Sequence, residues 1–376
     1  MIKIIVAGDF YPNDRIEKHI QNEQYGEVFG NVRPIIESAD YAVVNFECPV
    51  VLNDAKPIEK TGPALKSGVN AVKSIQFAGF NMATLANNHF YDYGEKGVSD
   101  TLITCKEHGI DTLGGGENLA AAAKVSYKEI HGRKIAFINF CEHEFSIATD
   151  KRGGSNPLDP VKNHNQILEA RNNADYVIVI VHGGHEYYQL PSIRMKETYR
   201  FFVDAGADVI INHHQHCFSG YEIYNGKPIF YGLGNFCFDN KKYRDNNWNE
   251  GYMVELNLQN GKISFDLHPY LQCNESPSVL PIIDGELLEK FTSKLEKLNR
   301  IIDDETILDH HHKEFLNENI TFMKLAFEPY EGRLLTSLYY RGLLPSFLKK
   351  RKLKMLANIQ CESHREKLIH TLKSMQ

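Results

Sequence analysis

Five short apolar segments of this chain each end in side chains that can bind a metal ion. In chain order, the endings are Asp9, Asn45-Phe46-Glu47, Asn87-Asn88-His89, His182 and Asn212-His213-His214-Gln215-His216. A mixture of carboxylate, imidazole and amide oxygen suits Mn, Fe or Zn. Two such ions could share a bridging carboxylate and a bridging hydroxide, which would attack a substrate while the ions neutralise negative charge. A histidine that binds no metal could protonate the leaving group.

The segments that must position these side chains alternate with helical patterns, which is typical of an α/β fold. We expect buried strands at 3–7, 41–46, 82–86, 134–140, 176–181 and 208–212. We expect helices at 69–78, 97–108 and 194–205, each followed by a glycine. Ligand sites of α/β sheets lie beyond the carboxyl ends of the strands, so the five endings are predicted to converge on one place.

The chain changes character in its last third. Strands are predicted at 228–231, 252–258 and 262–268, and the last two are separated by the hairpin signal Gln259-Asn260-Gly261. After Pro281 the apolar residues recur at helical spacing. From Arg341 onward there are nine Lys or Arg residues against two Asp or Glu. We therefore expect one domain at 1–272, which carries the site, and a helical C-terminal extension at 273–376.

Composition and charge narrow the class of protein. The chain is 42% apolar and 24% charged, which is ordinary for a globular enzyme and excludes a coiled coil. Its net charge of −6 argues against general nucleic-acid binding. Its seven cysteines include no C-x-x-C pair, so we expect no disulfide framework and a reducing compartment. We find neither an apolar run long enough for a membrane span nor a signal-peptide pattern, and we expect a cytoplasmic location.

The ordered motifs resemble those of the CapA family, the capsule or poly-γ-glutamate synthesis proteins within the calcineurin-like metallophosphoesterase superfamily. They are Gly8-Asp9, Asn45-x-Glu47, Ala86-Asn87-Asn88-His89-x-x-Asp92-x-Gly94, His182-x-Gly184-x-Glu186-Tyr187, His213-His214-x-His216 and Gly232-Leu233-Gly234-Asn235-Phe236. The resemblance covers about residues 1–272. It implies a layered α/β/β/α metallophosphoesterase-like sandwich with a mostly helical C-terminal extension, and one or two divalent metal ions per chain.

The resemblance also implies a role for each site residue. The metal ligands would be Asp9 and His216 for the first ion, Glu47 as the bridge, and Asn88, His182 and His214 for the second ion. The candidate catalytic side chains are His89 as the acid, Asp92 as its orienting partner, and Glu186 and His185. Glu186 belongs to the motif, whereas His185 is extra to it and could equally be pocket wall or surface.

One motif departs from the superfamily. The first motif of the superfamily is usually Asp-x-His, but in this chain the residues at that place are Asp9-Phe10-Tyr11. The first ion would therefore lose an imidazole, and its site is expected to be weak or empty. This departure leaves ordinary phosphoesterase activity open as a question.

Three functions follow from these residues. The leading hypothesis is a hydrolase that uses a metal-bound hydroxide on a phosphoester or amide-like bond, linked to capsule or poly-γ-glutamate-type polymer biosynthesis. The substrate would be a small molecule or a polymer of peptide, glycan or phosphoester type. The second hypothesis is a metal-dependent epimerase or isomerase, with His89 or His185 moving the proton. The third is a non-catalytic scaffold in a polymer-synthesis complex.

Other conspicuous residues have ordinary explanations. Cys217 and Cys237 are expected to be small buried core residues. His213 is expected to pack or to donate to backbone rather than to bind metal. The run His310-His311-His312 is expected to be a solvated helix face. The basic stretch Lys349-Lys350-Arg351-Lys352 could contact anionic lipid or polymer, although a solvated helix end is the simpler interpretation.

Overall fold

Two β-sheets, one of eight strands and one of six, form the centre of the first part of the chain. The computed structural model describes residues 1–375, except for the side chain of Lys350. The chain forms two compact units, and the first of them ends at Asp309. Each unit is considered by itself below.

The first sheet is mixed, and its order is β16-β15-β14-β1-β2-β3-β4, with β13 paired to the end of β1. Its strands are β1 (Ile2–Tyr11), β2 (Tyr41–Phe46), β3 (Met82–Thr84), β4 (Asp111–Leu113), β13 (Asn235–Phe238), β14 (Glu250–Gln259), β15 (Lys262–Gln272) and β16 (Val279–Pro281). The strands from β1 to β4 are parallel to one another. Their carboxyl ends therefore lie along one edge.

The second sheet has the order β11-β12-β10-β9-β7-β6. Its strands are β6 (Ser126–Ile130), β7 (Arg133–Cys141), β9 (Tyr176–His182), β10 (Val209–His213), β11 (Tyr221–Tyr224) and β12 (Lys227–Phe230). Strands β7, β9, β10 and β12 are parallel. A short ribbon of β5 (Gly115–Gly116) and β8 (Gly154–Ser155) lies outside both sheets.

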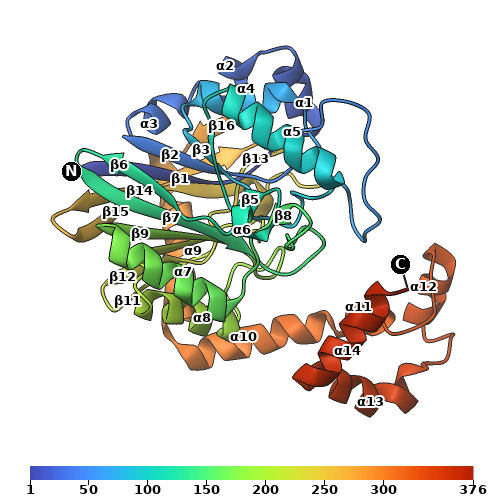
Figure 1. Ribbon diagram of the computed structural model, residues 1–376. Coiled ribbons are helices and arrows are strands. Elements are labelled where there is room, and N and C mark those ends of the chain that lie inside the picture. The colour runs from blue at the N-terminus through green and yellow to red at the C-terminus, as the bar shows by residue number, and fades with distance from the viewer. Residues whose placement is uncertain (376) are drawn as a thin grey trace. The chain divides into compact units, whose positions relative to one another are not determined.

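Helices cover the outer face of each sheet, and the two sheets face each other between them (Figure 1). The first sheet is covered by α1 (Asp14–Gln21), α2 (Tyr25–Phe29), α3 (Arg33–Glu37), α4 (Val69–Ala78) and α5 (Gly94–Glu107). The second is covered by α7 (Pro160–Asn173) and α8 (Ile193–Asp204), while α6 (Leu119–Ala122) packs by the small ribbon. This is the predicted α/β/β/α sandwich.

Alternation along β1 shows how the layers form. Ile5 and Ala7 point into the core under the helices, whereas Ile4 and Val6 point into the core between the sheets. Successive side chains of a strand face opposite sides, so one apolar strand can fill two cores. The apolar runs predicted as strands are buried strands for this reason.

Most predicted elements have the expected place. Helix α4 begins and ends where it was predicted, and the Asn260-Gly261 turn joins β14 to β15 with both residues at positive φ. Helix α9 (Gly285–Asp303) belongs to the first unit by packing, because Phe291 and Leu295 enter the core between the sheets. The compact unit thus extends beyond residue 272. The boundary at residue 272 for the domain that carries the site stays a prediction.

The second unit is helical, as predicted for the end of the chain. Its helices are the end of α10 (Glu305–Glu318), then α11 (Ile320–Leu325), α12 (Arg333–Tyr340), α13 (Leu348–Gln360) and α14 (Glu362–Lys373). Within the described residues, none of the helices is both long and apolar enough to cross a lipid bilayer. All seven cysteines are free thiols, and six of them are buried.

Gly8 allows two backbone segments to meet directly before Asp9. A Cβ at this position would lie 1.9 Å from the carbonyl oxygen of Gly234, which also accepts a hydrogen bond from the Asp9 N–H at 3.2 Å. Neither partner is a movable side chain, so a methyl group can be accommodated only if β13 moves away from β1. The glycine is therefore needed to hold Asp9 in place.

We expect Gly8→Ala to lower the free energy of unfolding by about 3 kcal/mol or more, because the added atom meets backbone rather than a flexible side chain. Chemical denaturation of the purified variant measures this change. Gly68→Ala is the matched control, since a Cβ there has no neighbour within 4 Å. Equal stability of the two variants would contradict the assigned role of Gly8.

Candidate metal centre

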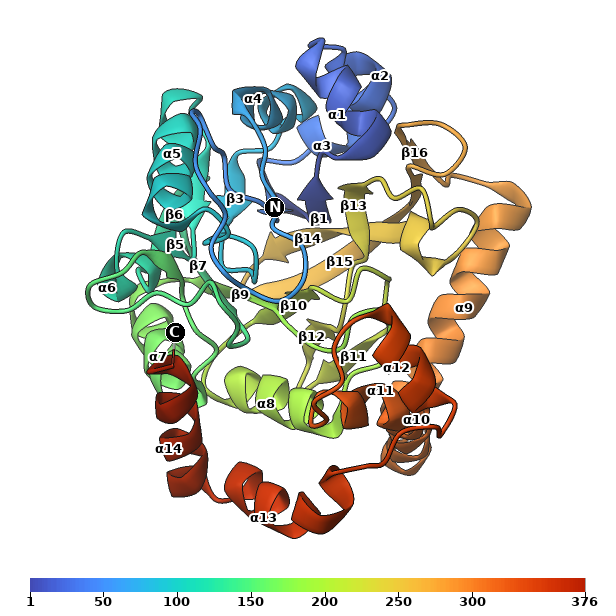
Figure 2. The same ribbon diagram turned by 90° about the vertical axis from the view of Figure 1, so that its right-hand side faces the viewer.

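The candidate ligands lie where strands of both sheets end. Asp9 is on β1 and Glu47 directly follows β2, in the first sheet. His182 ends β9, and His214 and His216 follow the neighbouring strand β10 in the second sheet. Because the parallel strands run the same way, their carboxyl ends meet at one side of the sandwich (Figure 2). The structure thus brings together side chains that are more than 200 residues apart in sequence.

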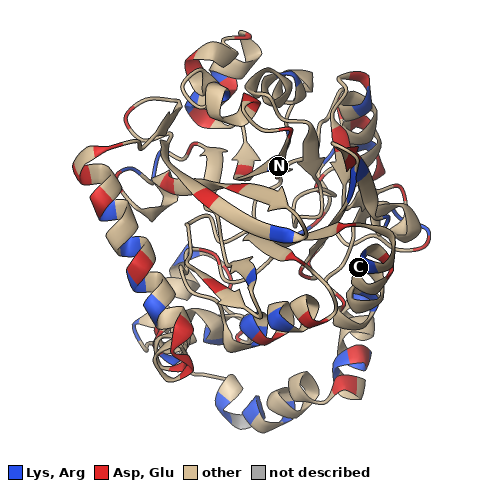
Figure 3. Ribbon diagram, turned by 90° about the vertical axis from the view of Figure 1, so that its left-hand side faces the viewer, with Lys and Arg blue, Asp and Glu red and all other residues tan. Residues whose placement is uncertain are grey.

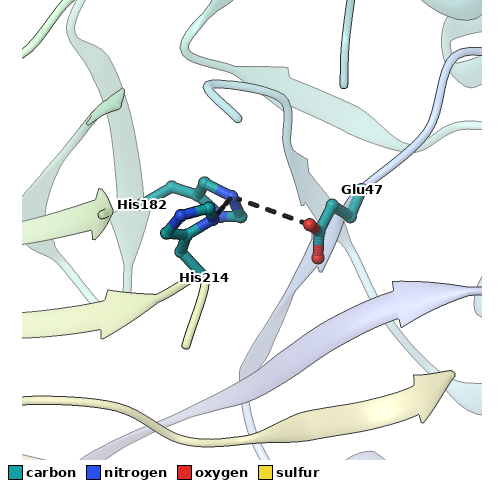
Figure 4. Close-up of side chains that lie close together, drawn as sticks. All are labelled: Glu47, His182 and His214. Carbon is teal, nitrogen blue, oxygen red and sulfur yellow. Dashed lines mark hydrogen bonds and ion pairs between the residues drawn. The ribbon is translucent and has the colours of Figure 1, made fainter. Parts of the chain in front are cut away.

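The first group of ligands is Glu47, His182 and His214 (Figure 4). Glu47 Oε1 lies 3.7 Å from His182 Nε2, and His214 Nδ1 lies 3.1 Å from the same nitrogen. Asn88 adds its Oδ1 at 3.1 Å from His182 Nε2. Two imidazoles, a carboxylate and an amide oxygen therefore surround one point, and all four residues are buried.

The second group is Asp9, Glu47 and His216. His216 Nδ1 lies 3.6 Å from Asp9 Oδ2, and its Nε2 lies 3.8 Å from Glu47 Oε1. Glu47 is common to both groups, so its carboxylate is placed to bridge two ions. This group has one imidazole where the first has two, in keeping with the absent Asp-x-His motif.

Burial sets the charge state of these groups. It raises the pKa of the Asp9 carboxyl to about 7, and it raises the pKa of Glu47 well above its ordinary range, with a smaller effect from the neighbouring Asp9 charge. It lowers the pKa of His214 to about 4 and that of His216 to about 3. A buried site disfavours every charged form, so the metal-free protein prefers neutral imidazoles and protonated acids.

The donor set fits a divalent cation. Both carboxylate oxygens of Glu47 are buried and lack a hydrogen-bond partner among the described residues. An unpaired buried carboxylate is costly, and buried charges in proteins are normally paired or bound to metal. Neutral imidazole nitrogen is the form that binds metal. These residues could therefore hold one or two ions.

His89 lies beside this centre with its own partners. Its Nδ1 is 2.7 Å from Asp92 Oδ2, and the Lys60 ammonium contacts Asp92 Oδ1 at 2.5 Å. The Leu65 N–H also donates to Asp92 at 2.7 Å. The structure thus places Asp92 against the His89 ring, and its role as the orienting partner stays a prediction. Lys60 was not singled out from sequence, because it lies in a polar loop without periodicity.

Two asparagines support the ligands from behind. Asn45 donates from Nδ2 to Asp9 Oδ1 at 2.7 Å and lies 3.2 Å from His182 Nδ1. Asn235 on β13 holds His216 through a 2.9 Å contact between its Oδ1 and the ring Nδ1. Partners of this kind fix the orientation of a ligand ring. Both asparagines belong to motifs noted in the sequence, which was the available signal.

The remaining predicted residues lie around the centre and outside the two ligand groups. The charge of Glu186 raises the pKa of Glu47, and that of His185 lowers the pKa of His214, which places both side chains near the ligands. His213 Nδ1 is 3.6 Å from Asp9 Oδ1. Neither ring nitrogen of His213 is hydrogen-bonded within the described residues, so of the two alternatives expected for this ring the backbone contact is not found and packing remains.

We predict that Asp9→Asn stabilises the metal-free protein at about pH 8 by up to about 4 kcal/mol relative to wild type. The pKa of Asp9 is raised from 3.8 to about 7 in the folded state. Its contribution to stability is therefore complete below about pH 4 and is lost progressively as the pH rises from about 4 to about 7. The asparagine removes that loss.

Urea denaturation with a chelator present, at about pH 5 and about pH 8, measures the difference between variant and wild type. The gain should shrink at the lower pH. The exposed Asp54→Asn is the control and should change neither midpoint. A variant that is equally destabilised at both pH values would contradict the burial argument.

Known proteins are similar in sequence to most of this chain. Residues 3–240 match the family of the bacterial capsule synthesis protein PGA_cap. The capsule biosynthesis protein CapA of Bacillus anthracis is 34% identical over 71% of this chain and 67% of that protein. The PGA biosynthesis protein CapA of Bacillus subtilis (strain 168) is 34% identical over 70% of each chain.

Solved structures that align with this chain are less similar to it in sequence than the two CapA proteins are. A hypothetical protein from Thermus thermophilus is 14% identical, with a TM-score of 0.48, and covers 72% of this chain and 99% of that one. A putative 5'-nucleotidase from Staphylococcus aureus is 16% identical, with a TM-score of 0.44, over 79% and 58% of the two chains. The family match and the two CapA relatives establish that the chain belongs to the bacterial capsule synthesis protein (PGA_cap) family.

Proposed function

We propose that this chain is a metal-dependent hydrolase that cleaves a phosphoester or amide-like bond in capsule or poly-γ-glutamate-type polymer biosynthesis. One observation carries the proposal: Glu47, buried and without a hydrogen-bond partner among the described residues, belongs to both ligand groups. A shared carboxylate between two ion positions is the arrangement that two-metal hydrolases use. The relatives named for capsule and PGA biosynthesis supply the polymer context.

The proposed ions are Mn, Fe or Zn, one or two per chain, held by Asp9, Glu47 and His216 and by Glu47, Asn88, His182 and His214. When bound, they would supply Lewis acidity that activates water and neutralises negative charge on the substrate. The buried setting strengthens these electrostatic effects, because little water remains to screen them.

His89 is the proposed acid. Asp92 contacts its Nδ1 at 2.7 Å, so the acid would be the doubly protonated ring, and the proton to be transferred would be the one at Nε2. Its ring lies at the edge of the centre, with 10% of the side chain exposed. His89 would donate that proton to the leaving group as the bond breaks, and Asp92 keeps the ring turned toward it.

Lys60 is the proposed positioning residue for this pair. Its side chain is only 4% exposed, and its ammonium pairs with Asp92 while lying 3.3 Å from His89 Nδ1. The cation supplies the opposite charge that a buried carboxylate needs as a partner. It also ties the loop between β2 and α4 to the centre.

The second candidate is a metal-dependent epimerase or isomerase. It is favoured by the unequal ligand groups, because the second group offers a single imidazole and could leave one ion position vacant. One ion could acidify a carbon next to a carbonyl, and His89 or His185 could carry the proton. Solvent deuterium that enters an unhydrolysed product would identify this reaction.

We expect the double variant His214→Ala, His216→Ala to lose the bound metal and all turnover, because it removes an imidazole from each ligand group. Elemental analysis of both purified proteins, after reconstitution with Mn, Fe or Zn, gives the metal content per chain. His131→Ala is the control, since this side chain is 63% exposed and pairs only with Asp40 among the contacts described.

A wild-type protein that binds no metal would exclude both enzymatic proposals and leave the scaffold hypothesis. Turnover that persists in the double variant would place the chemistry elsewhere.

We expect Lys60→Met to lower kcat by about tenfold or more, since a misplaced general acid forfeits part of a contribution of about 100-fold to 10,000-fold. The loss should be largest for substrates with poor leaving groups, which need the proton most. Rates for a series of aryl phosphates of different leaving-group pKa measure it.

Lys60→Arg should restore much of the rate, because it keeps the cation. Lys56→Met, in the same loop and exposed, should act like wild type. A loss that is equal for all leaving groups would show that Lys60 only stabilises the loop.

A further inference from the structure

The second unit leaves its large apolar side chains uncovered. Among the described residues from His310 to residue 375, none of the apolar side chains is buried. The side chains that stand in solvent are Leu316, Ile320, Phe322, Met323, Phe327, Leu334, Leu335, Tyr340, Leu343, Phe347, Leu353, Leu356, Ile359, Ile369, Leu372 and Met375. Apolar surface on this scale marks an interaction site rather than a finished fold.

Polar contacts and a few contacts between aromatic rings, rather than a buried core, connect the helices of this unit. The carboxylate of Glu328 accepts hydrogen bonds from the N–H of Phe347 at 2.8 Å and from the hydroxyl of Ser346 at 2.5 Å. The Tyr330 hydroxyl donates to the carbonyl of Pro345 at 2.6 Å. These bonds fix the start of α13 and leave its apolar residues free to be covered by a partner.

The charge of the unit is opposite to that of the rest of the chain. From His310 onward there are 12 Lys or Arg residues and 6 Asp or Glu, whereas residues 1–309 carry 30 and 42. The excess is concentrated in α13, where Lys349, Arg351, Lys352 and Lys354 are exposed, and Figure 3 shows Lys and Arg along this helix. The helix contains no acidic residue.

Apolar and basic residues share the surface of α13. Leu353, Leu356 and Ile359 recur at three-residue spacing and so lie on one side of the helix, with 73%, 49% and 42% of each residue exposed. Phe347 and Leu343 stand exposed immediately before the helix. A partner must therefore bind cations and apolar side chains over the same short stretch.

We propose that the helices from His310 onward dock on the surface of a lipid bilayer that contains anionic phospholipids. Such a surface offers phosphate charge for the lysines and, just below it, hydrocarbon for the leucines. A polyanion in solution would pair with the basic side chains but leave the apolar side chains in water. It would therefore match the charge of this surface and not its apolar residues. Docking lies beyond the proposed hydrolase function and does not depend on it.

The test is sedimentation of the full chain with vesicles of phosphatidylcholine and with vesicles of phosphatidylcholine mixed with phosphatidylglycerol. Wild type should sediment with the mixed vesicles alone, and less so in high salt. The variant Lys352→Gln, Lys354→Gln should partition about 25-fold more weakly, given about fivefold for each cation. The variant Leu353→Ser, Leu356→Ser should lose binding as well.

Matched controls lie in the first unit, where Ile223→Ser and Lys262→Gln change exposed residues of the same kinds. They should bind as wild type does. All substitutions are at exposed positions, and unchanged circular dichroism and metal content show that each variant is folded.

Three results would overturn the proposal. The first is no sedimentation with either vesicle. The second is binding to soluble poly-L-glutamate that competes with the vesicles and is indifferent to the leucine substitutions. The third is a dimer in light scattering that the leucine substitutions abolish, with vesicle binding absent. None of these results bears on the proposed hydrolase function, because the metal content of the protein is measured separately.

Discussion

The packing of two sheets face to face is the constraint on which the rest of the structure depends. Val6 and Val43 of the first sheet share one apolar core with Ile180 and Ile211 of the second. The parallel strands then end at the same side of the sandwich, so ligands from both sheets meet at Glu47. Neither sheet could form the centre alone, because the first supplies the carboxylates and the second supplies the imidazole ligands. Close packing makes this geometry rigid before any ligand arrives.

The cost of that arrangement is electrostatic. Asp9, Glu47 and three histidines are held where water is excluded, and burial shifts the pKa of each away from its charged form. Asn45 and Asn235 offset a part of the cost by hydrogen bonding to Asp9 and His216. The unpaired oxygens of Glu47 remain, and a cation is the partner that would satisfy them. A stable fold and an electrostatically strained centre coexist because the sheets supply the stability.

Sequence alone predicted the strands and the order of their endings, since buried parallel strands are continuous apolar runs and a polar residue after such a run is easily seen. It did not reveal Lys60, because a cation in a polar loop has no period that distinguishes it from a solvated one. Nor could it place α9, whose helical spacing shows that Phe291 and Leu295 share a face but not which core they enter. The His213 ring was expected to pack or to donate to backbone, and because neither nitrogen is hydrogen-bonded in the described structure, only the packing alternative remains. The surroundings of Lys60, α9 and His213 are all set by segments that are distant in sequence.

The shared position of Glu47 would make the binding of one ion depend on the binding of the other. Two ions that use one carboxylate are thermodynamically linked, so each changes the affinity of the other by the same factor. The group with two imidazoles would bind its ion first, and that ion would favour the ionised form of Glu47. The group with one imidazole would then bind its ion through a carboxylate that is already ionised, but against the repulsion of the first dication. The weaker position would therefore be the first to empty as the free metal concentration falls.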